Sequence, residues 1–198
     1  MPDPARRTLP SPTELAAAVG RTIPDILGDD LAVLFVGINP GLVSGATGRH
    51  FARPGNRFWP VLHDAGFTPR QLRPDEQADL PVLGLGITNL VARATASAAE
   101  LSDDELRDGG QRLLALVEAS GPRFVAFLGL TSYRVAFGRR GATVGEQPDP
   151  IAGARAWVLP NPSGLNASYP GFESKLVWFR RLRDSLERGA GRAGAGGP

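Results

Sequence analysis

The chain alternates between short, continuous runs of apolar residues and longer segments in which apolar residues recur at helical spacing. Continuous apolar runs that end close to a glycine or proline are typical of strands buried on both faces of a sheet. Four strands are predicted, at residues 31–37, 82–90, 123–129 and within 154–164, where the run stops at Pro160.

Segments with the apolar spacing of a helix separate the predicted strands. The segment 102–120 opens with a serine cap and an acidic first turn, and it carries Leu113, Leu116 and Val117 on one face. Other helices are predicted at residues 11–20, 56–66 and 171–189. Strands that alternate with helices predict an α/β fold whose mostly parallel sheet is covered on both faces.

The two ends of the chain differ in composition from the middle. Residues 1–11 are rich in proline and arginine, and residues 189–198 are mainly glycine and alanine. Because neither stretch can bury a core, we expect a flexible N-terminal arm at 1–11, a single domain at 12–188 and a disordered tail at 189–198.

The composition excludes several classes of function. The 198 residues include no cysteine, which rules out disulfides, thiolate catalysis and cysteine-based metal sites. The sequence shows no cluster of metal ligands, no nucleotide-binding phosphate loop and no apolar run long enough to cross a membrane. Because the N-terminus also lacks a signal-peptide pattern, we expect a cytoplasmic protein that needs no metal or other cofactor.

The charge pattern is less informative. The formal net charge is +2, and all but one of the 22 basic residues are arginine, which makes forked contacts with phosphate. A nucleic-acid partner must therefore be argued from local patches of charge.

The stretch LFVGINPG, residues 34–41, ends a predicted strand on the neutral amide of Asn39. In α/β sheets, ligands bind beyond the carboxyl ends of the strands, and the segment NPSG at 161–164 follows the last strand toward the same crevice. The loop at 37–59 is too long for a simple connector and holds Phe51 among polar residues. A structural turn built from glycine and proline is the alternative interpretation.

The second loop, PNPSGLNAS at 160–168, is stiffened by its prolines and carries Leu165 at its tip. An exposed apolar residue on a stiff loop can act as a wedge between stacked bases. Alternatively, Leu165 folds back onto the core, and the loop taken alone favours that interpretation.

Three motifs, taken in order, resemble a known family. GINPG at 37–41, FARPGNRFW at 51–59 and NPSGL at 161–165 are similar to the mismatch-specific uracil/thymine-DNA glycosylases, the Mug branch of the uracil-DNA glycosylase superfamily. The resemblance implies a three-layer αβα sandwich with a short, mostly parallel central sheet. It also implies a monomeric DNA-repair enzyme whose partner is double-stranded DNA with G·U or G·T mismatches. Such an enzyme flips the base out and hydrolyses its N-glycosidic bond, leaving an abasic site.

The resemblance also assigns roles to residues. Asn39 positions the attacking water and Phe51 stacks on the flipped base. Contacts with the base are implied for Gly37, Ile38, Pro40, Gly41 and Ser44. A wedge that enters the duplex is implied at Asn161, Pro162, Ser163, Gly164 and Leu165.

The chain departs from the family at Ala92, where the family pattern has an aspartate that could polarise water or stabilise positive charge on the sugar, so the resemblance predicts impaired activity for this chain. Around the first loop, phosphate contacts are expected from Arg49, Arg53 and Arg57, and His50 is expected at the mouth of the site. The cations of the last helix either bind phosphate as well or form a solvated face; they are Lys175, Arg180, Arg181 and Arg183.

A neutral amide limits the chemistry to the placement of water. Its oxygen can orient a water molecule but cannot accept a proton as a carboxylate does. Uracil leaves as a delocalised anion, so a placed water and a stabilised leaving base can suffice. Two alternatives remain open: a hydrolase of free nucleosides or nucleotides, and a DNA-binding module without catalysis.

Overall fold

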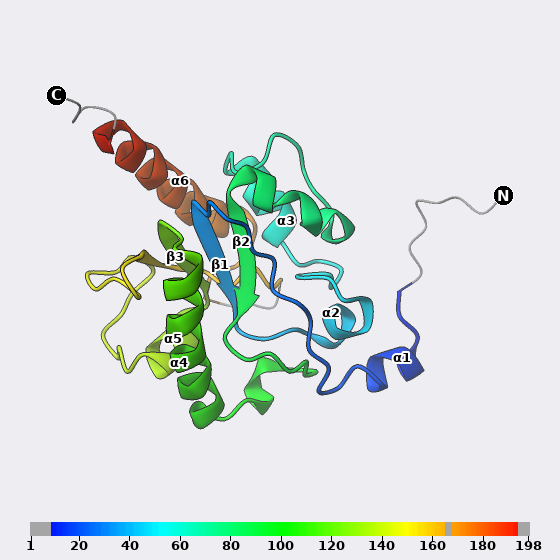
Figure 1. The fold of residues 1–198 in the computed structure, drawn as a ribbon. Helices are drawn as coiled ribbons and strands as arrows, with labels where there is room; N and C mark the ends of the chain where they lie inside the picture. Colours follow the sequence, from blue (N-terminus) through cyan, green and yellow to red (C-terminus); the bar gives the residue numbers. More distant parts are fainter. Residues whose placement is uncertain (1–8, 165–167, 194–198) are drawn as a thin grey trace.

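A five-stranded sheet in the order β2-β1-β3-β5-β4 forms the centre of the computed structural model, which describes residues 9–164 and 168–193 (Figure 1). The strands are β1 (Val33–Gly37), β2 (Leu85–Asn89), β3 (Phe124–Leu128), β4 (Gly145–Glu146) and β5 (Arg155–Leu159). All neighbouring pairs are parallel except β4 with β5. The edge strand β4 has no counterpart among the strands predicted from the sequence, because two residues are too few to produce an apolar run.

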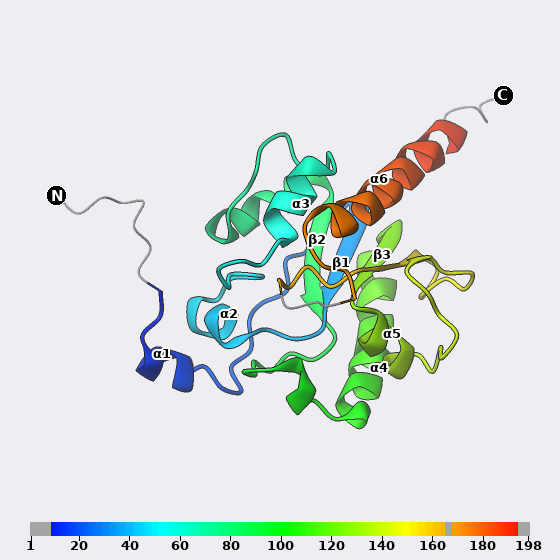
Figure 2. The same cartoon turned by 180° about the vertical axis from the view of Figure 1, so that it is seen from behind.

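Two layers of helices cover the sheet, as Figures 1 and 2 show from opposite sides. In β1, Val33 and Phe35 belong to one core cluster with α3 (Phe58–Asp64) and α6 (Glu173–Ala193). Residues Leu34 and Val36 of the same strand join the opposite cluster, with α4 (Asp103–Ser120) and α5 (Leu130–Ala136). Alternate side chains of a strand point to opposite faces, which explains the continuous apolar runs. The predicted three-layer αβα sandwich with a short, mostly parallel sheet is confirmed.

The remaining helices are short: α1 (Pro12–Ala16), α2 (Leu42–Thr47), and the 3₁₀ helices η1 (Pro74–Asp79), η2 (Pro81–Leu83) and η3 (Ala98–Glu100). Helix α2 lies inside the segment 37–59 that the sequence analysis treats as a loop. It begins after Gly41, ends at Gly48 with φ 69°, and owes its existence to packing more than to propensity, since Ser44 and Gly45 are its buried residues.

The last helix is longer than expected. Helix α6 continues to Ala193, into the segment 189–198 that the sequence analysis assigns to a disordered tail. A formed helix gains one hydrogen bond for each residue added, and alanine and arginine are good helix formers, so the helix extends past Gly189. Residues 194–198, like residues 1–8 of the predicted arm, lie outside the described part. No helix among the described residues is long and apolar enough to cross a membrane.

The carboxyl edge of the sheet gathers the loops of interest. The pairing of β1 with β2 continues beyond the strands, because Leu90 N donates to Gly37 O at 2.9 Å and Thr95 N donates to Pro40 O at 3.1 Å. Asn39 therefore lies opposite the segment that follows β2. The segment after β5 reaches the same edge, where Arg57 N donates to Pro162 O at 3.0 Å.

Two adjacent glycines let α4 lie directly against this edge. A Cβ atom at Gly109 would stand 2.2 Å from Leu90 O, and one at Gly110 would stand 2.8 Å from Ala136 O. Main-chain atoms on both neighbours leave no room for a methyl group. Gly109 therefore sets the distance between α4 and the end of β2, and Gly110 sets the distance between α4 and the end of α5.

Replacing Gly109 with alanine tests this close packing. Alanine is the better helix former by about 1 kcal/mol, so an unhindered site would be stabilised. We expect the clash with Leu90 O to dominate and to lower the free energy of unfolding by about 1–3 kcal/mol, the usual cost of overpacking. Denaturant unfolding measures the change, with Gly141→Ala as control because a Cβ there meets nothing within 4 Å. A stabilised G109A protein would contradict the prediction.

Candidate active site

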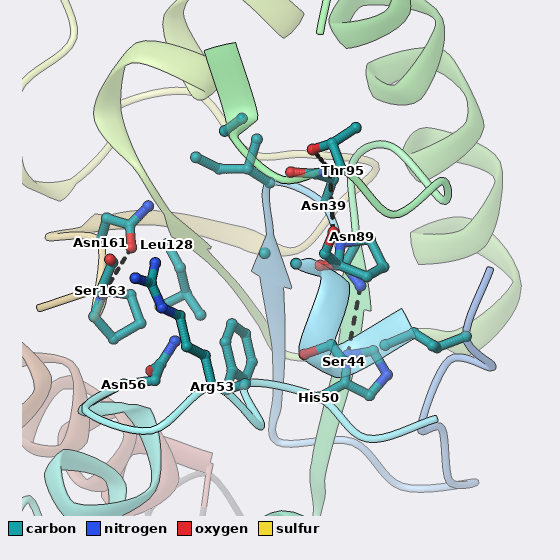
Figure 3. Close-up of a pocket in the computed structure, with 18 of the residues that line it drawn as sticks. Asn39, Ser44, His50, Arg53, Asn56, Asn89, Thr95, Leu128, Asn161 and Ser163 are labelled. Carbon is teal, nitrogen blue, oxygen red and sulfur yellow. Dashed lines mark hydrogen bonds between the residues drawn. The ribbon is translucent and has the colours of Figure 1, made fainter. Parts of the chain in front are cut away.

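A pocket of about 170 Å³ opens at the carboxyl edge of the sheet, between the segments that follow β1, β2 and β5 (Figure 3). The structure brings most of the predicted site residues together in its lining. These are Gly37, Ile38, Asn39, Pro40, Gly41, Ser44, Phe51, Arg53, Asn161, Pro162 and Ser163, together with His50.

Some predicted residues lie elsewhere. Ala92 is exposed and does not line the pocket, so the structure does not place its side chain at the site. Gly164 is exposed beyond the lining, and Leu165, the predicted wedge, lies outside the described residues. Arg49 and Arg57 are half-buried near the pocket without lining it.

Three polar residues of the lining were missed by the sequence analysis. Asn89 ends β2, Thr95 lies on the segment after it, and Asn56 precedes α3. Asn89 could have been found, because an asparagine that ends an apolar strand next to β1 repeats the situation of Asn39. Thr95 carries no comparable feature, since only the continued pairing beyond β2 brings it to Pro40.

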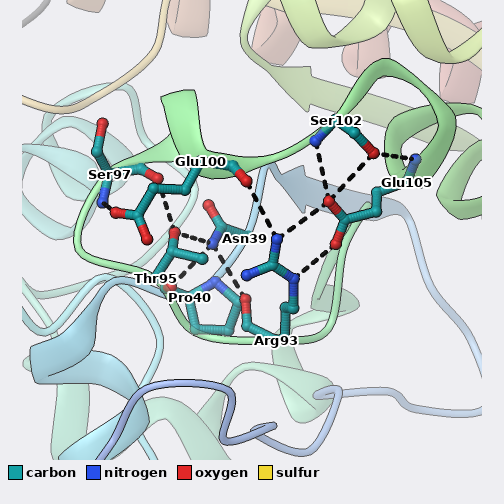
Figure 4. A network of polar contacts seen from close by, with 8 residues as sticks. All are labelled: Asn39, Pro40, Arg93, Thr95, Ser97, Glu100, Ser102 and Glu105. Carbon is teal, nitrogen blue, oxygen red and sulfur yellow. Dashed lines mark hydrogen bonds and ion pairs between the residues drawn. The ribbon is translucent and has the colours of Figure 1, made fainter. Parts of the chain in front are cut away.

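The surroundings of the Asn39 amide fix its orientation. Its Nδ2 donates to Pro40 O at 3.2 Å, to Arg93 O at 3.1 Å and to Thr95 Oγ1 at 2.7 Å. Carbonyl oxygens only accept, and the Thr95 hydroxyl uses its own proton to donate to Ser97 O at 2.8 Å. The amino group of Asn39 must therefore face these three atoms (Figure 4).

This orientation leaves the Asn39 oxygen for the pocket. No described residue donates a hydrogen bond to Oδ1, and the side chain is half-buried in the pocket lining. A carbonyl oxygen in this position can accept a hydrogen bond from a water molecule. The lone pairs of that water then face away from Asn39, toward the space of the pocket. Asn39 thus combines a firmly bound amino group with an available acceptor.

A second amide, that of Asn89, is oriented in a similar way. His50 is buried, and its Nε2 lies 2.9 Å from Pro24 O, which can only accept, so Nε2 carries the proton. Burial lowers the pKa of His50 despite the Pro24 carbonyl and the nearby Asp25, which both raise it. The ring is therefore neutral, and its Nδ1 accepts from Asn89 Nδ2 at 3.4 Å.

The oxygen of Asn89 then points toward Gly37. A Cβ atom built on Gly37 would lie 2.4 Å from Asn89 Oδ1 and 3.4 Å from the ring of Phe51. The glycine keeps open the space between a hydrogen-bond acceptor and an aromatic ring. Figure 3 shows Asn39 and Asn89 at the same end of the pocket.

Phe51 lines this space in an unusual backbone conformation. Its φ of 53° lies in the left-handed region, which costs a residue with a side chain about 1–2 kcal/mol. Stacking on Phe58, with centroids 4.1 Å apart, and the hydrogen bond from Ala52 N to Ser44 Oγ at 3.3 Å hold it there. Strain retained beside a pocket is consistent with a functional requirement for the position of the ring.

Hydrogen bonds hold the start of the predicted wedge loop and the residues that follow its end. At its start, Asn161 Oδ1 accepts from Ser163 N at 2.9 Å. Beyond its end, the buried Lys175 donates to Tyr169 O and to Gly171 O. Burial lowers the pKa of Lys175, and the neighbouring Arg57 lowers it further. Lys175 therefore supports the residues that follow the loop and is not available as the phosphate contact considered from the sequence.

Two arginines at the pocket are not neutralised by a neighbouring carboxylate among the described residues. Arg53 is exposed in the lining and Arg49 lies nearby, and neither forms an ion pair with a described residue. In contrast, ion pairs with carboxylates engage Arg70, Arg73, Arg107, Arg139 and Arg155. On the last helix, Arg183 pairs with Glu187. Positive charge near the pocket thus remains available for an anion.

The described lining offers no carboxylate, thiol or lysine. Among the residues that the structure describes, no group of three or more histidine, aspartate and glutamate side chains is placed to hold a metal ion. The chemistry of this lining therefore consists of oriented amides, hydroxyls, main-chain groups, a neutral imidazole and one exposed guanidinium.

The chain is similar to known proteins over most of its length. Residues 24–184 match the family described as the Uracil DNA glycosylase superfamily. A solution NMR structure of a protein from Methanosarcina acetivorans, named a "putative Uracil DNA glycosylase", is similar to the chain with a TM-score of 0.58 and 22% sequence identity. The similarity covers 83% of this chain and 99% of that chain, and at this identity it shows a shared fold.

Replacing Asn39 with aspartate tests the orientation of the amide. One carboxylate oxygen would face the three acceptors that now surround Nδ2, and this repulsion raises the pKa of the new acid above its ordinary value of about 3.9. Stability relative to the wild type should therefore fall as the pH rises through that ordinary value. We expect a deficit of at least about 1 kcal/mol at pH 7, since one pKa unit corresponds to about 1.4 kcal/mol.

Denaturant unfolding at about pH 4 and pH 7 measures the effect. Asn56→Asp serves as the matched control, because Asn56 Oδ1 accepts from Phe58 N at 2.9 Å and a carboxylate can do the same. If N39D and N56D show the same pH dependence, the Asn39 amide is not oriented as described.

Proposed function

The chain belongs to the uracil-DNA glycosylase superfamily, and from this premise we propose that it acts on mismatched double-stranded DNA. It hydrolyses the N-glycosidic bond of uracil opposite guanine, and more slowly that of thymine, and leaves an abasic site. We place it in the Mug branch, acting as a monomer without a cofactor. The single observation that carries the proposal is the oriented Asn39 oxygen in a pocket whose described lining contains no carboxylate.

Hydrolysis by this site depends on placement and on the leaving group. Asn39 Oδ1 accepts a hydrogen bond from water and holds it toward the anomeric carbon of a flipped nucleotide. The bond between that carbon and N1 breaks with its electron pair moving to the base, so the sugar approaches an oxocarbenium ion that the water attacks. The proton that the water then loses passes to the departing uracil anion or to solvent, which gives the hydroxyl of the abasic site and neutral uracil. Asn56, whose oxygen is engaged by Phe58 N, directs its amino group to stabilise the uracil anion.

Recognition of the base follows from Asn89 and Phe51. Uracil and thymine carry a proton on N3, whereas N3 of cytosine is an acceptor. The Asn89 oxygen beside Gly37 would accept from the N3–H of uracil and repel cytosine. The ring of Phe51 provides the surface on which the base stacks, which every pyrimidine can use. The pocket therefore favours uracil over cytosine through the orientation of one amide.

Access to the pocket requires the nucleotide to leave the duplex. Flipping costs a few kcal/mol and costs less for mismatched pairs, which favours G·U and G·T over matched pairs. We propose that Gly164 and Leu165 enter the gap, as their place in the NPSGL motif suggests. The unpaired Arg53 and Arg49 bind phosphates, so affinity for duplex DNA should fall with salt.

Single-turnover assays with excess enzyme test this function. The substrates are duplex oligonucleotides with uracil or thymine opposite guanine or adenine, a single strand with uracil, and free deoxyuridine. We expect the fastest release of uracil from the G·U duplex, detected as alkali-labile abasic sites. Hydrolysis of free deoxyuridine with none of DNA would instead indicate a nucleoside hydrolase. Binding without any release would indicate a DNA-binding module.

Replacing Gly37 with alanine tests the place of the base. The new methyl group would occupy the space between Asn89 Oδ1 and Phe51, at 2.4 Å from that oxygen. We expect uracil excision from the G·U duplex to fall by about a hundredfold or more, since displacement of a bound group by about 1 Å can cost that much. Gly141→Ala, remote from the pocket and unhindered, should keep the wild-type rate. Equal rates for G37A and the wild type would mean that the base binds elsewhere.

A further inference from the structure

We propose that Arg93 and Glu105 are positioning residues for Asn39: their ion pair holds the loop that orients the amide. The inference rests on the proposed function, because it assigns a catalytic consequence to that orientation. Neither residue lines the pocket, and neither touches the space where the base would bind.

The ion pair has the geometry of a forked contact. Arg93 Nε donates to Glu105 Oε1 at 2.6 Å, and Arg93 Nη2 donates to Oε2 at 3.0 Å. Two parallel hydrogen bonds between planar groups fix the relative orientation of their side chains, which a single contact does not. Figure 4 shows this pair together with the hydrogen bond from the Asn39 amide to the main-chain oxygen of Arg93.

Glu105 is itself fixed to the start of α4. Its carboxylate accepts from Ser102 N at 2.9 Å, and its main-chain nitrogen donates to Ser102 Oγ at 3.2 Å. The hydrogen bonds from Arg93 and then from Ser102 lower the pKa of Glu105 to about 2. The carboxylate is therefore ionised at any pH at which a DNA duplex would be assayed, so its charge is available to Arg93 throughout that range.

Arg93 also joins the two ends of the segment 93–100, which we call the ring. Its Nη2 donates to Glu100 O at 3.2 Å. That segment supplies two of the three acceptors around the Asn39 amino group, Arg93 O and Thr95 Oγ1. If the ring opens, the main-chain hydrogen bonds of Ala94 N to Arg21 O and of Thr95 N to Pro40 O remain, but Arg93 O and Thr95 Oγ1 lose the side-chain support that fixes their position against the amide.

A neutral amide makes such support necessary. A carboxylate activates water by taking a proton, and a small error in its position is partly offset by its basicity. Asn39 contributes placement alone, so its catalytic effect depends on a fixed orientation. We therefore expect loosening of the ring to reduce the rate of bond cleavage without reducing the affinity for DNA.

The experiment compares Glu105→Gln with Glu146→Gln. Glutamine at 105 keeps the size of the side chain and can still cap α4, but it loses the charge and one acceptor for Arg93. Glu146 also pairs with an arginine, since its Oε1 accepts from both Nε and Nη2 of Arg155 at the opposite, amino end of β5, away from the pocket. Arg93→Lys is a second variant, because a lysine cannot donate simultaneously along the fork and to Glu100 O.

The first readout is independent of enzyme activity. NMR of ¹⁵N-labelled protein detects the two protons on Asn39 Nδ2, assigned by their loss in Asn39→Ala. We expect E105Q and R93K to accelerate exchange of these protons with solvent by about tenfold, and E146Q to leave it unchanged. Unchanged exchange in both E105Q and R93K would overturn the inference, whatever the enzyme does.

The second readout is the single-turnover rate of uracil release, measured beside the dissociation constant for the same G·U duplex. We expect E105Q to lose about tenfold to a hundredfold in rate with duplex affinity within about twofold of the wild type. In the Asn39→Ala background the E105Q change should add nothing, since the residues act through one another. Wild-type rates in E105Q, or equal losses in both backgrounds, would overturn the inference. A wild-type protein that releases no uracil would overturn the proposed function instead.

Discussion

The three oxygen acceptors around the amino group of Asn39 are the constraint on which the site depends. Because a carboxylate could not satisfy them, they select an amide, and because they engage only Nδ2, they leave Oδ1 for the pocket. Asn89 repeats the arrangement, with a neutral histidine that binds its amino group and an open space before its oxygen. Each amide thus has one end bound to the protein and the other available to a ligand, which gives two fixed acceptors without any buried charge.

The fold provides this constraint through the junction of β1, β2 and α4. The parallel pairing that continues beyond β1 and β2 brings the segment 93–95 beside Asn39. Helix α4 reaches the same junction because Gly109 lets it approach Leu90 O, and from there Arg112 donates to Asn89 O. The start of the helix holds Arg93 through Glu105. One helix therefore supports both the segment that carries Asn89 and the segment that binds the Asn39 amide, which explains why a pocket of loops can have a defined geometry.

The sequence was sufficient for the layers of the fold and for most of the pocket, for a physical reason. Continuous apolar runs identify strands buried on both faces, and the carboxyl ends of parallel strands converge, so Asn39 and Asn161 could be placed together. Thr95 and the Arg93–Glu105 pair could not be found in this way, because their roles arise from a loop that closes only in three dimensions. Lys175 looked like a surface cation on a helix, yet it is fully buried beneath main-chain carbonyls. The position of Ala92 was inferred from a family pattern, and the exposure of its side chain became visible only in the structure.

Under the proposed function, the absence of a general base is itself a source of selectivity. A carboxylate would accelerate attack on any flipped nucleotide, whereas an amide lowers the barrier only by placement, so the quality of the leaving group decides the rate. Uracil satisfies this requirement, and the Asn89 oxygen disfavours cytosine, the normal partner of guanine. Flipping adds to the selectivity, because it costs less free energy for a base in a mismatched pair than for a base in a matched pair. A slow reaction centre protects intact DNA only if its geometry does not vary, and this connects the chemistry of the pocket to the ion pair behind it.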